Sequence, residues 1–177
     1  MVDCSTHFAA ILDFVGNARE GLTKSVFLFV SQLTPMVNVD LLIKNELGQT
    51  LLTWRDDEFY QAGWHVPGGV IRFKELAQTR IQLVAKSELG ATVQAETSAM
   101  CVNELMAAHR DVRGHFISLL YRCYLTSDLD ATKAYRPADA LQNGALQNSA
   151  IQNGHWKWHD GCPKNIIAQH EVYRQYM

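Results

Sequence analysis

The feature that most constrains the fold is a glycine turn followed by a long uninterrupted segment near the middle of the chain. Residues 64–66 run into Pro67-Gly68-Gly69, and residues 75–89 hold no glycine or proline before Gly90. Because glycine and proline interrupt regular structure, this order predicts a strand, a tight loop and a helix that Gly90 closes. Two adjacent glycines also leave backbone amide and carbonyl groups open to a ligand, although turns with a purely structural role are commoner.

The predicted helix carries an apolar stripe that ends in a carboxylate. Ala77, Ile81, Val84 and Ala85 share one face, and Glu88 continues that face one turn further on. The helix macrodipole disfavours a negative charge in the last turn by about 0.3–1 kcal/mol unless a cation compensates. A bound metal would supply that cation, whereas a solvated glutamate near a helix end needs none.

Strands and helices alternate along the rest of the chain. Helices are predicted over residues 8–15, 22–33 and after Pro163, and strands over residues 36–43, 50–54, 64–66, 91–104, 115–126 and 156–158. The turn chemistry of residues 45–48 predicts a hairpin between the first two strands. The class is therefore α/β, with a mixed sheet covered by helices on both sides.

Composition limits the function classes. With 177 residues, 47% of them hydrophobic, the chain can bury one core, so residues 1–177 are expected to form a single domain. A formal charge of -2 argues against nucleic acid as the main partner. The apolar run at 26–30 is too short to span a bilayer, and no leader precedes it, so a cytoplasmic protein without a membrane partner is expected. Four scattered cysteines suit neither a zinc site nor a disulfide scaffold.

Residues 140–154 repeat one five-residue motif three times, as Ala-Leu-Gln-Asn-Gly, Ala-Leu-Gln-Asn-Ser and Ala-Ile-Gln-Asn-Gly. Repeat architectures usually need several stacked units to bury a continuous core. A repetitive loop or short helix is therefore predicted in preference to a solenoid.

The spacing around the helix resembles the Nudix box, written GX5EX7REUXEEXGU, over residues 68–91. The positions that match are Gly69, Glu75, Glu88 and Gly90. The box is degenerate, because Leu83 and Val84 stand at its Arg-Glu pair and Ser87 at its penultimate glutamate. The resemblance implies an α/β/α sandwich and a site where oxygen ligands gather Mg²⁺ around a diphosphate.

The pattern of losses is most similar to the GDP-mannose mannosyl hydrolase branch, whose box also lacks two glutamates. The likeness covers residues 34–177 and includes residues 39–41, 51–55, 64–69 and 165–173. That branch breaks a sugar carbon–oxygen bond and releases free sugar and a nucleoside diphosphate with inversion. The resemblance therefore implies a nucleotide-sugar substrate and a homodimer, in which the N-terminal helical extension, residues 1–33, would cover the sheet or a second subunit.

The resemblance also implies site residues. The metal ligands would be Glu88, the carbonyl of Gly68 and Gln152, although Gln142 and Gln147 share the local sequence of Gln152. The substrate would contact Asp40 and Arg55, which are the matching positions on two early strands, since the forked donors of arginine suit phosphate. Arg55 and His109 would assist catalysis, with the histidine placed to help the leaving group depart.

Two arginines of the resembled branch are missing. Val70 stands where an arginine reaches the diphosphate, and Arg72 is a candidate substitute for binding substrate. Leu83 stands at the box arginine, with Arg80 one turn earlier.

The general base is displaced as well. Asn153 occupies the position of the branch's catalytic histidine, and asparagine cannot accept a proton at neutral pH. His155 lies two residues further along and becomes the candidate base, with His115 and His65 as alternatives.

Three functions remain open. The first is Mg²⁺-dependent hydrolysis of a nucleoside-diphosphate sugar to free sugar. The second is conventional cleavage of a phosphoanhydride with a displaced base, and the third is a Nudix-like domain that binds a nucleotide without turnover.

Overall fold

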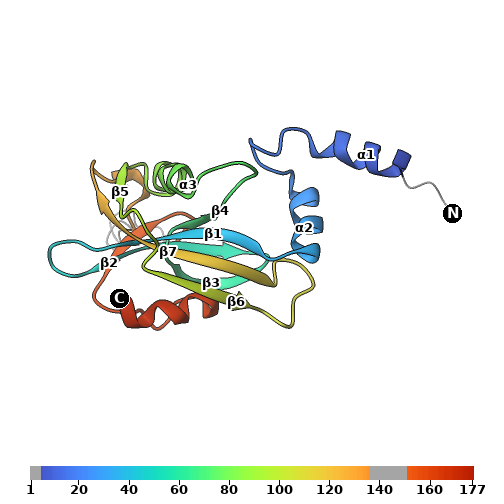
Figure 1. The fold of residues 1–177 in the computed structure, drawn as a ribbon. Helices are drawn as coiled ribbons and strands as arrows, with labels where there is room; N and C mark the ends of the chain where they lie inside the picture. The colour runs from blue at the N-terminus through green and yellow to red at the C-terminus, as the bar shows by residue number, and fades with distance from the viewer. Residues whose placement is uncertain (1–4, 136–150) are drawn as a thin grey trace, which may run out of the picture.

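The computed structural model describes residues 5–135 and 151–177, so most of the predicted repeat at 140–154 lies outside the described residues. Figure 1 shows a sheet with α3 on one face and η4 on the other, while α1 and α2 project at one end. The helical elements are α1 (Ser5–Val15), α2 (Lys24–Leu33), α3 (Ala77–Val84), the π-helical turn η1 (Ala85–Leu89), and the 3-10 helices η2 (Ala131–Lys133) and η4 (Ala168–Tyr176). The strands are β1 (Met36–Ile43), β2 (Thr50–Asp57), β3 (Tyr60–His65), β4 (Gly68–Val70), β5 (Val93–Ala95), β6 (Cys101–Met106), β7 (His115–Leu125) and β8 (Trp156–His159).

The strands form two sheets. The larger sheet has the order β4-β1-β7-β5, and β6 also pairs with β7. It is mixed, because β1 and β7 run parallel while the other pairs are antiparallel. The smaller sheet has the order β3-β2-β8 and is antiparallel. The predicted α/β class with a mixed sheet between helices is confirmed.

The predicted hairpin between the first two strands is wrong. β1 and β2 share a single bridge, between Lys44 and Thr50, and then enter different sheets. The turn itself is tight, since the amide of Asn45 donates to the carbonyl of Gln49 at 3.1 Å. Beyond this bridge β1 pairs with β4 and β7, and β2 pairs with β3 and β8, so the two strands do not continue as a hairpin ladder.

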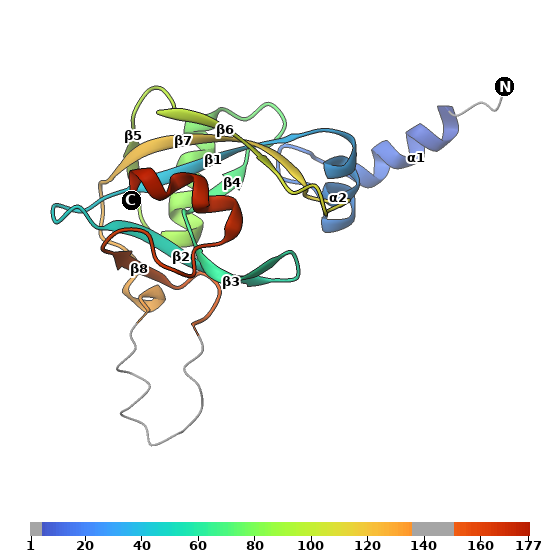
Figure 2. The same cartoon turned by 90° about the horizontal axis from the view of Figure 1, so that it is seen from below.

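The core lies on both faces of β1. Val39, Leu41 and Ile43 pack with α3 and η1, while the alternate residue Leu42 packs toward η4. Successive side chains of a strand point to opposite faces, which explains the nearly continuous apolar sequence of β1. Asp40 shares the face of Leu42 and therefore points toward η4, which crosses the strands on the face opposite α3 (Figure 2).

The central helix begins two residues later than predicted, at Ala77, and ends where it was predicted to end, at Leu89. Its last turn, η1, is π-helical, and Gly90 caps it. Gly90 adopts the left-handed φ of 64°, as a closing glycine should. The predicted apolar stripe is confirmed, because Ile81, Val84 and Ala85 are buried and Ala77 packs against them. π-helical turns are rare and frequently occur at functional sites.

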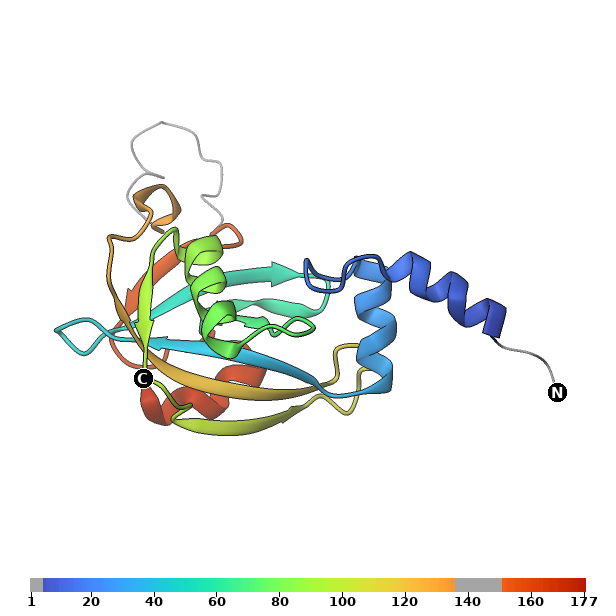
Figure 3. The same cartoon turned by 45° about the horizontal axis from the view of Figure 1, so that its top comes forward.

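The two ends of the chain also form helices where they were predicted. In the C-terminal segment Ile166, Ile167, His170 and Tyr173 are all buried. At the other end α1 extends away from the body of the molecule (Figure 3). Within the described part of the chain, no helix combines the length and the apolar character needed to cross a membrane.

Candidate functional site

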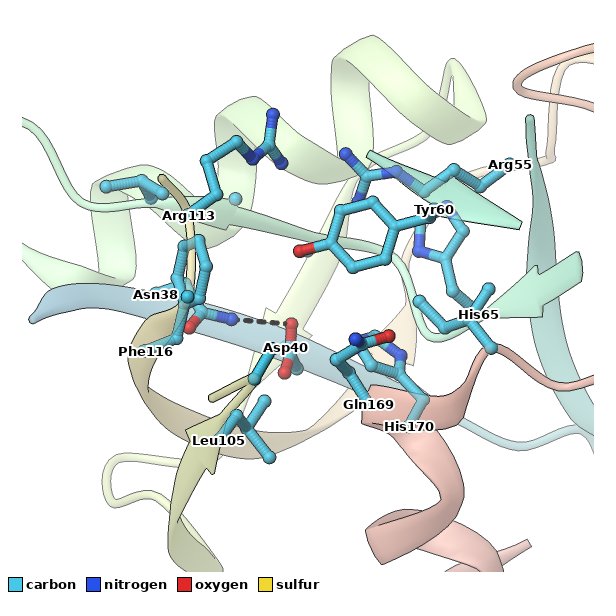
Figure 4. Close-up of a pocket in the computed structure, with 16 residues that line it drawn as sticks. Asn38, Asp40, Arg55, Tyr60, His65, Leu105, Arg113, Phe116, Gln169 and His170 are labelled. Carbon is cyan, nitrogen blue, oxygen red and sulfur yellow. Dashed lines mark hydrogen bonds between the residues drawn. The ribbon is translucent and has the colours of Figure 1, made fainter. Parts of the chain in front are cut away.

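A cleft of about 160 Å³ opens between β1, β3, β4, the β6–β7 loop and η4. Figure 4 shows Tyr60 between Arg55 and Arg113, with Asp40 below them in this view. Gly68, His65 and His170 also line the cleft. Residues from six separate segments of the chain therefore meet at one place.

Gly68 lies directly opposite Asp40 in the β1–β4 ladder. The backbone bond next to this pair runs from the amide of Leu41 to the carbonyl of Pro67, at 2.8 Å. Ladder bonds of an antiparallel pair skip alternate residues, so the amide and carbonyl of Gly68 point away from β1. A side chain on Gly68 would collide with the Asp40 carboxylate, so glycine is required here.

Asp40 is buried and holds three hydrogen bonds. Asn38 Nδ2 donates to Oδ1 at 2.9 Å, while the hydroxyls of Ser118 and of Tyr173, the latter at 2.5 Å, donate to Oδ2. Burial raises the pKa of Asp40 to about 6, although the three donors oppose that rise. At neutral pH the carboxylate is charged, and its three donors hold it rigidly at the cleft floor.

We expect the stability difference between Asp40→Asn and the wild type to depend on pH. Between the ordinary pKa of 3.8 and the folded-state pKa of about 6, the folded protein binds more protons than the unfolded chain. The contribution of Asp40 to the free energy of unfolding therefore falls as pH rises through this window, on the order of 2–3 kcal/mol in total. Thermal melts in EDTA should show the Tm of the variant rising relative to wild type from about pH 4 to about pH 7. A constant difference would contradict the assigned environment of Asp40.

Glu88 reaches the backbone of Gly68 from the π-helical turn. Its Oε1 accepts from the amide of Gly68 at 3.3 Å, and its Oε2 accepts from Thr53 Oγ1 at 3.0 Å. Burial raises the pKa of Glu88 to about 7, and the nearby Asp40 raises it further, while its hydrogen bonds and Arg55 lower it. A cation placed beside this carboxylate would favour its charged form.

Hydrogen bonds fix the tautomers of two buried histidines in the cleft. His65 Nδ1 donates to the carbonyl of Val66 at 2.8 Å, and its Nε2 lies 3.1 Å from Thr53 Oγ1. His170 Nδ1 accepts from the amide of Val66 at 3.0 Å, so its proton lies on Nε2. Burial lowers the pKa of each to about 3, which keeps both rings neutral and makes them weak bases.

Comparison with known proteins identifies the fold. No protein-family model matches the chain. A MutT NUDIX hydrolase from Burkholderia pseudomallei superposes with a TM-score of 0.58 at 16% identity, covering 81% of this chain and 98% of that one. A MutT protein from Methanosarcina mazei gives a TM-score of 0.56 at 16% identity, covering 81% and 94%. The chain has the Nudix fold.

One curated relative is similar in sequence. The low-salt glycan biosynthesis protein Agl8 of Haloferax volcanii is 34% identical over 98 residues. The match covers 53% of this chain and 62% of that protein, so it spans less than two thirds of the relative.

Glu75 and Glu88, the two glutamates at positions that resemble the Nudix box, have different surroundings. Glu75 is bound at 2.8 Å by Arg80 through Nε and through Nη2, and it also accepts from the amide of Arg72 at 2.8 Å. Both side chains of this ion pair are only 10% exposed. The ion pair of Glu75 and Arg80 therefore holds the loop against the helix. Arg80 would have to break this ion pair to take the place of the arginine that the resemblance expects at Leu83.

Several predicted site residues lie outside the cleft. Arg72 packs beside Gly21 in a separate hollow under the N-terminal segment. His109 lines a hollow next to the cleft, which shares Tyr60 with it. His115 bonds Glu104 at 2.9 Å on the β6–β7 ladder.

Gln152 and His155 belong to the turn before β8. The amide of Gln152 donates to His155 Nδ1 at 3.1 Å, and the carbonyl of His155 accepts from the amide of Trp54 at 2.7 Å. Asn153, at the expected position of the base, binds both backbone groups of Asp56, with Nδ2 donating at 2.6 Å. These hydrogen bonds hold the turn against β2 at Trp54 and Asp56. Trp54 follows Thr53, whose hydroxyl donates to Glu88.

The structure adds cleft residues that sequence reasoning did not single out. Arg113, Tyr60 and His170 line the cleft, and Ser118 and Tyr173 hold Asp40. The signal that could have found the loop is its charge, because Arg110 and Arg113 stand close together between two predicted strands. The contacts of Asp40 gave no local signal, because Tyr173 is 133 positions away.

Proposed function

We propose that this chain is a Mg²⁺-dependent hydrolase of a nucleoside-diphosphate sugar similar to GDP-mannose, releasing free sugar and a nucleoside diphosphate. The observation that supports it most is that one box carboxylate, Glu88, reaches the Gly68 backbone, while the other, Glu75, is locked by Arg80. A single carboxylate suits one metal on a departing diphosphate better than the several metals of phosphoanhydride cleavage.

The donors at this place fit a weakly held Mg²⁺. The carbonyl of Gly68 points away from β1, and Glu88 carries two oxygens beside the same residue. No group of three or more His, Cys, Asp or Glu residues in the described ranges could hold a metal by itself. Mg²⁺ commonly binds one or two carboxylates and takes its remaining ligands from substrate phosphates and water. We propose Gln152 as the further protein ligand, with tight metal binding only when a diphosphate is present.

The metal would stabilise the negative charge of the departing diphosphate. In the proposed reaction, water attacks the anomeric carbon, and the electrons of the broken carbon–oxygen bond go to the diphosphate oxygen. Arg55 would bind that diphosphate, Asp40 would accept from a substrate hydroxyl, and His109 would assist departure from the neighbouring hollow. His155 is the proposed base, and it must exchange its bond with the Gln152 amide for one with water.

A nucleotide-binding domain without turnover is the second candidate. It is favoured by the engagement of Asn153 with Asp56 and of His155 Nδ1 with the Gln152 amide. In this case the cleft would bind a nucleoside-diphosphate sugar, and no group would activate water.

Incubation with a panel of nucleoside-diphosphate sugars and Mg²⁺ should separate these candidates. We expect at least one substrate to yield equimolar free sugar and nucleoside diphosphate, resolved by anion-exchange chromatography. Sugar phosphate plus nucleoside monophosphate would show phosphoanhydride cleavage and refute the proposal. Calorimetric binding of a panel member without any product would establish the second candidate. The expected homodimer and cytoplasmic location remain predictions, which sedimentation and fractionation can check.

A further inference from the structure

Three arginines gather around one aromatic ring at the mouth of the cleft. The guanidinium carbons of Arg55, Arg110 and Arg113 lie 4.2, 4.5 and 5.5 Å from the ring centre of Tyr60. Arg55 is paired with Asp57 at 2.6 Å. Across residues 5–135 and 151–177, neither Arg110 nor Arg113 forms a salt bridge. All three like charges lie around the same ring, so a bound anion would offset the repulsion between them.

The two loop arginines are also short of hydrogen-bond acceptors. Arg113 Nε and Arg110 Nη1 are buried and have no partner among the described residues. A buried donor without an acceptor has lost its hydration without replacement. Arg113 lines the cleft, Arg110 lines the neighbouring hollow, and Tyr60 lines both. The two arginines therefore lie in adjacent hollows that share Tyr60 as a lining residue.

Helix α2 holds Arg113 from behind. The amide of Arg113 donates to Ser31 Oγ at 3.0 Å, and its guanidinium lies 5.5 Å from the ring centre of Phe27 on the same helix. Arg113 has a φ of 52°, a left-handed value that costs a non-glycine residue energy unless its surroundings impose it. Ser31 is buried and its hydroxyl donates to the carbonyl of Leu28 at 2.7 Å, so its oxygen is fixed as the acceptor.

The rest of the cleft cannot supply this charge. Val70 lines the cleft without a charge, and Leu83 lies on α3, 40% exposed and outside the cleft lining. Arg80 is committed to Glu75, and Arg72 lies in another hollow. The arginines that remain are those around Tyr60, of which Arg55 and Arg113 line the cleft and Arg110 lines the neighbouring hollow.

We propose that Arg110 and Arg113 of the β6–β7 loop form, with Arg55, the subsite that binds the diphosphate of the ligand, and that α2 positions Arg113 through Ser31. The guanidinium fork binds phosphate oxygens in pairs, and three such groups match a ligand with two linked phosphates. This inference rests on the proposed function for the identity of the ligand. It gives the N-terminal extension a role in the site of its own subunit.

Calorimetry with inorganic pyrophosphate in EDTA tests the subsite without the metal and without turnover. We expect wild type to bind pyrophosphate, and Arg113→Ala to weaken binding roughly 10- to 100-fold, since hydrogen bonds between charged groups are lost. Arg113→Lys keeps the charge but loses the forked guanidinium, so we expect a loss of pyrophosphate affinity between those of wild type and Arg113→Ala. A thermal melt of this variant with an unchanged Tm would exclude a folding defect. Arg19→Ala, at an exposed position before α2, is the matched control and should bind as wild type does.

The role of α2 is tested separately. Ser31→Ala should weaken pyrophosphate binding about 3- to 10-fold by freeing the Arg113 amide, whereas Ser25→Ala, at an exposed position of the same helix, should not. Absence of pyrophosphate binding by wild type, or equal affinity in Arg113→Ala, would overturn the subsite, and equal affinity in Ser31→Ala alone would overturn the role of α2.

The two proposals fail in different ways. Pyrophosphate binding that depends on Arg113, without any turnover of nucleotide sugars, would leave the subsite standing and refute the hydrolase. Turnover of a nucleotide sugar with an unchanged KM in Arg113→Ala would support the hydrolase and refute the subsite.

Discussion

Glu88→Gln is expected to lower kcat/KM on the best nucleoside-diphosphate sugar by about 100- to 1,000-fold, because the charged ligand that holds the metal on the leaving group is lost. Its stability should not fall with its activity. The glutamine oxygen can still accept from the Gly68 amide, and its NH2 group can donate to Thr53 Oγ1. The variant also no longer has to ionise a buried carboxyl whose pKa is raised to about 7. Thermal melts in EDTA at about pH 8 should therefore give a Tm equal to or above that of wild type.

The same variant also changes the metal dependence. Titration of Mg²⁺ at saturating substrate should give a higher half-saturating concentration in Glu88→Gln, whereas Glu96→Gln, at an exposed position, should match wild type. Unchanged activity with unchanged Mg²⁺ dependence would show that Glu88 is not a metal ligand. A large loss of Tm would instead assign this glutamate a structural role.

Arg80→Ala is expected to have the largest effect on folding, a loss of about 3–5 kcal/mol in the free energy of unfolding. The substitution removes both hydrogen bonds that Arg80 makes to Glu75 and leaves a buried carboxylate without its cation. Urea denaturation followed by tryptophan fluorescence measures this directly.

A double variant separates the charge from the packing. Glu75→Gln with Arg80→Met keeps an acceptor for the Arg72 amide and a long side chain against the loop, so most of the loss should be recovered. A double variant as unstable as Arg80→Ala would mean that the two guanidinium hydrogen bonds, and not the unpaired carboxylate, account for the loss. A mild effect of Arg80→Ala would refute the structural role assigned to this pair.

The sequence predicted those elements of the fold that depend on interactions between residues close together in the chain. The helix before Gly90, the strand of residues 115–126 and the aromatic strand at 156–158 are present because periodicity and turn residues specify them. The hairpin was wrong for the opposite reason. A turn fixes the reversal of the chain, but it does not fix which strands β1 joins, and its partner β7 lies about 80 positions away.

The residues of the candidate site were also predictable only in part from the sequence. Asp40, Arg55 and Gly68 were expected at the site from the resemblance, and all three line the same cleft. Arg113 could not be assigned, because its direction depends on contacts with Ser31 of α2, 82 positions away. Arg72 illustrates the converse, since closeness in sequence to Gly69 does not place it in the cleft when Gly21 packs against its guanidinium.

We propose that a sugar carbon–oxygen bond breaks while a metal held beside Glu88 and Gly68 stabilises the departing diphosphate. Hydrolysis in water enriched in oxygen-18, followed by mass spectrometry of both products, tests it most directly. The account predicts that the free sugar carries the heavy oxygen and that the nucleoside diphosphate carries none. Heavy oxygen in a phosphate product would place the attack on phosphorus and contradict the account.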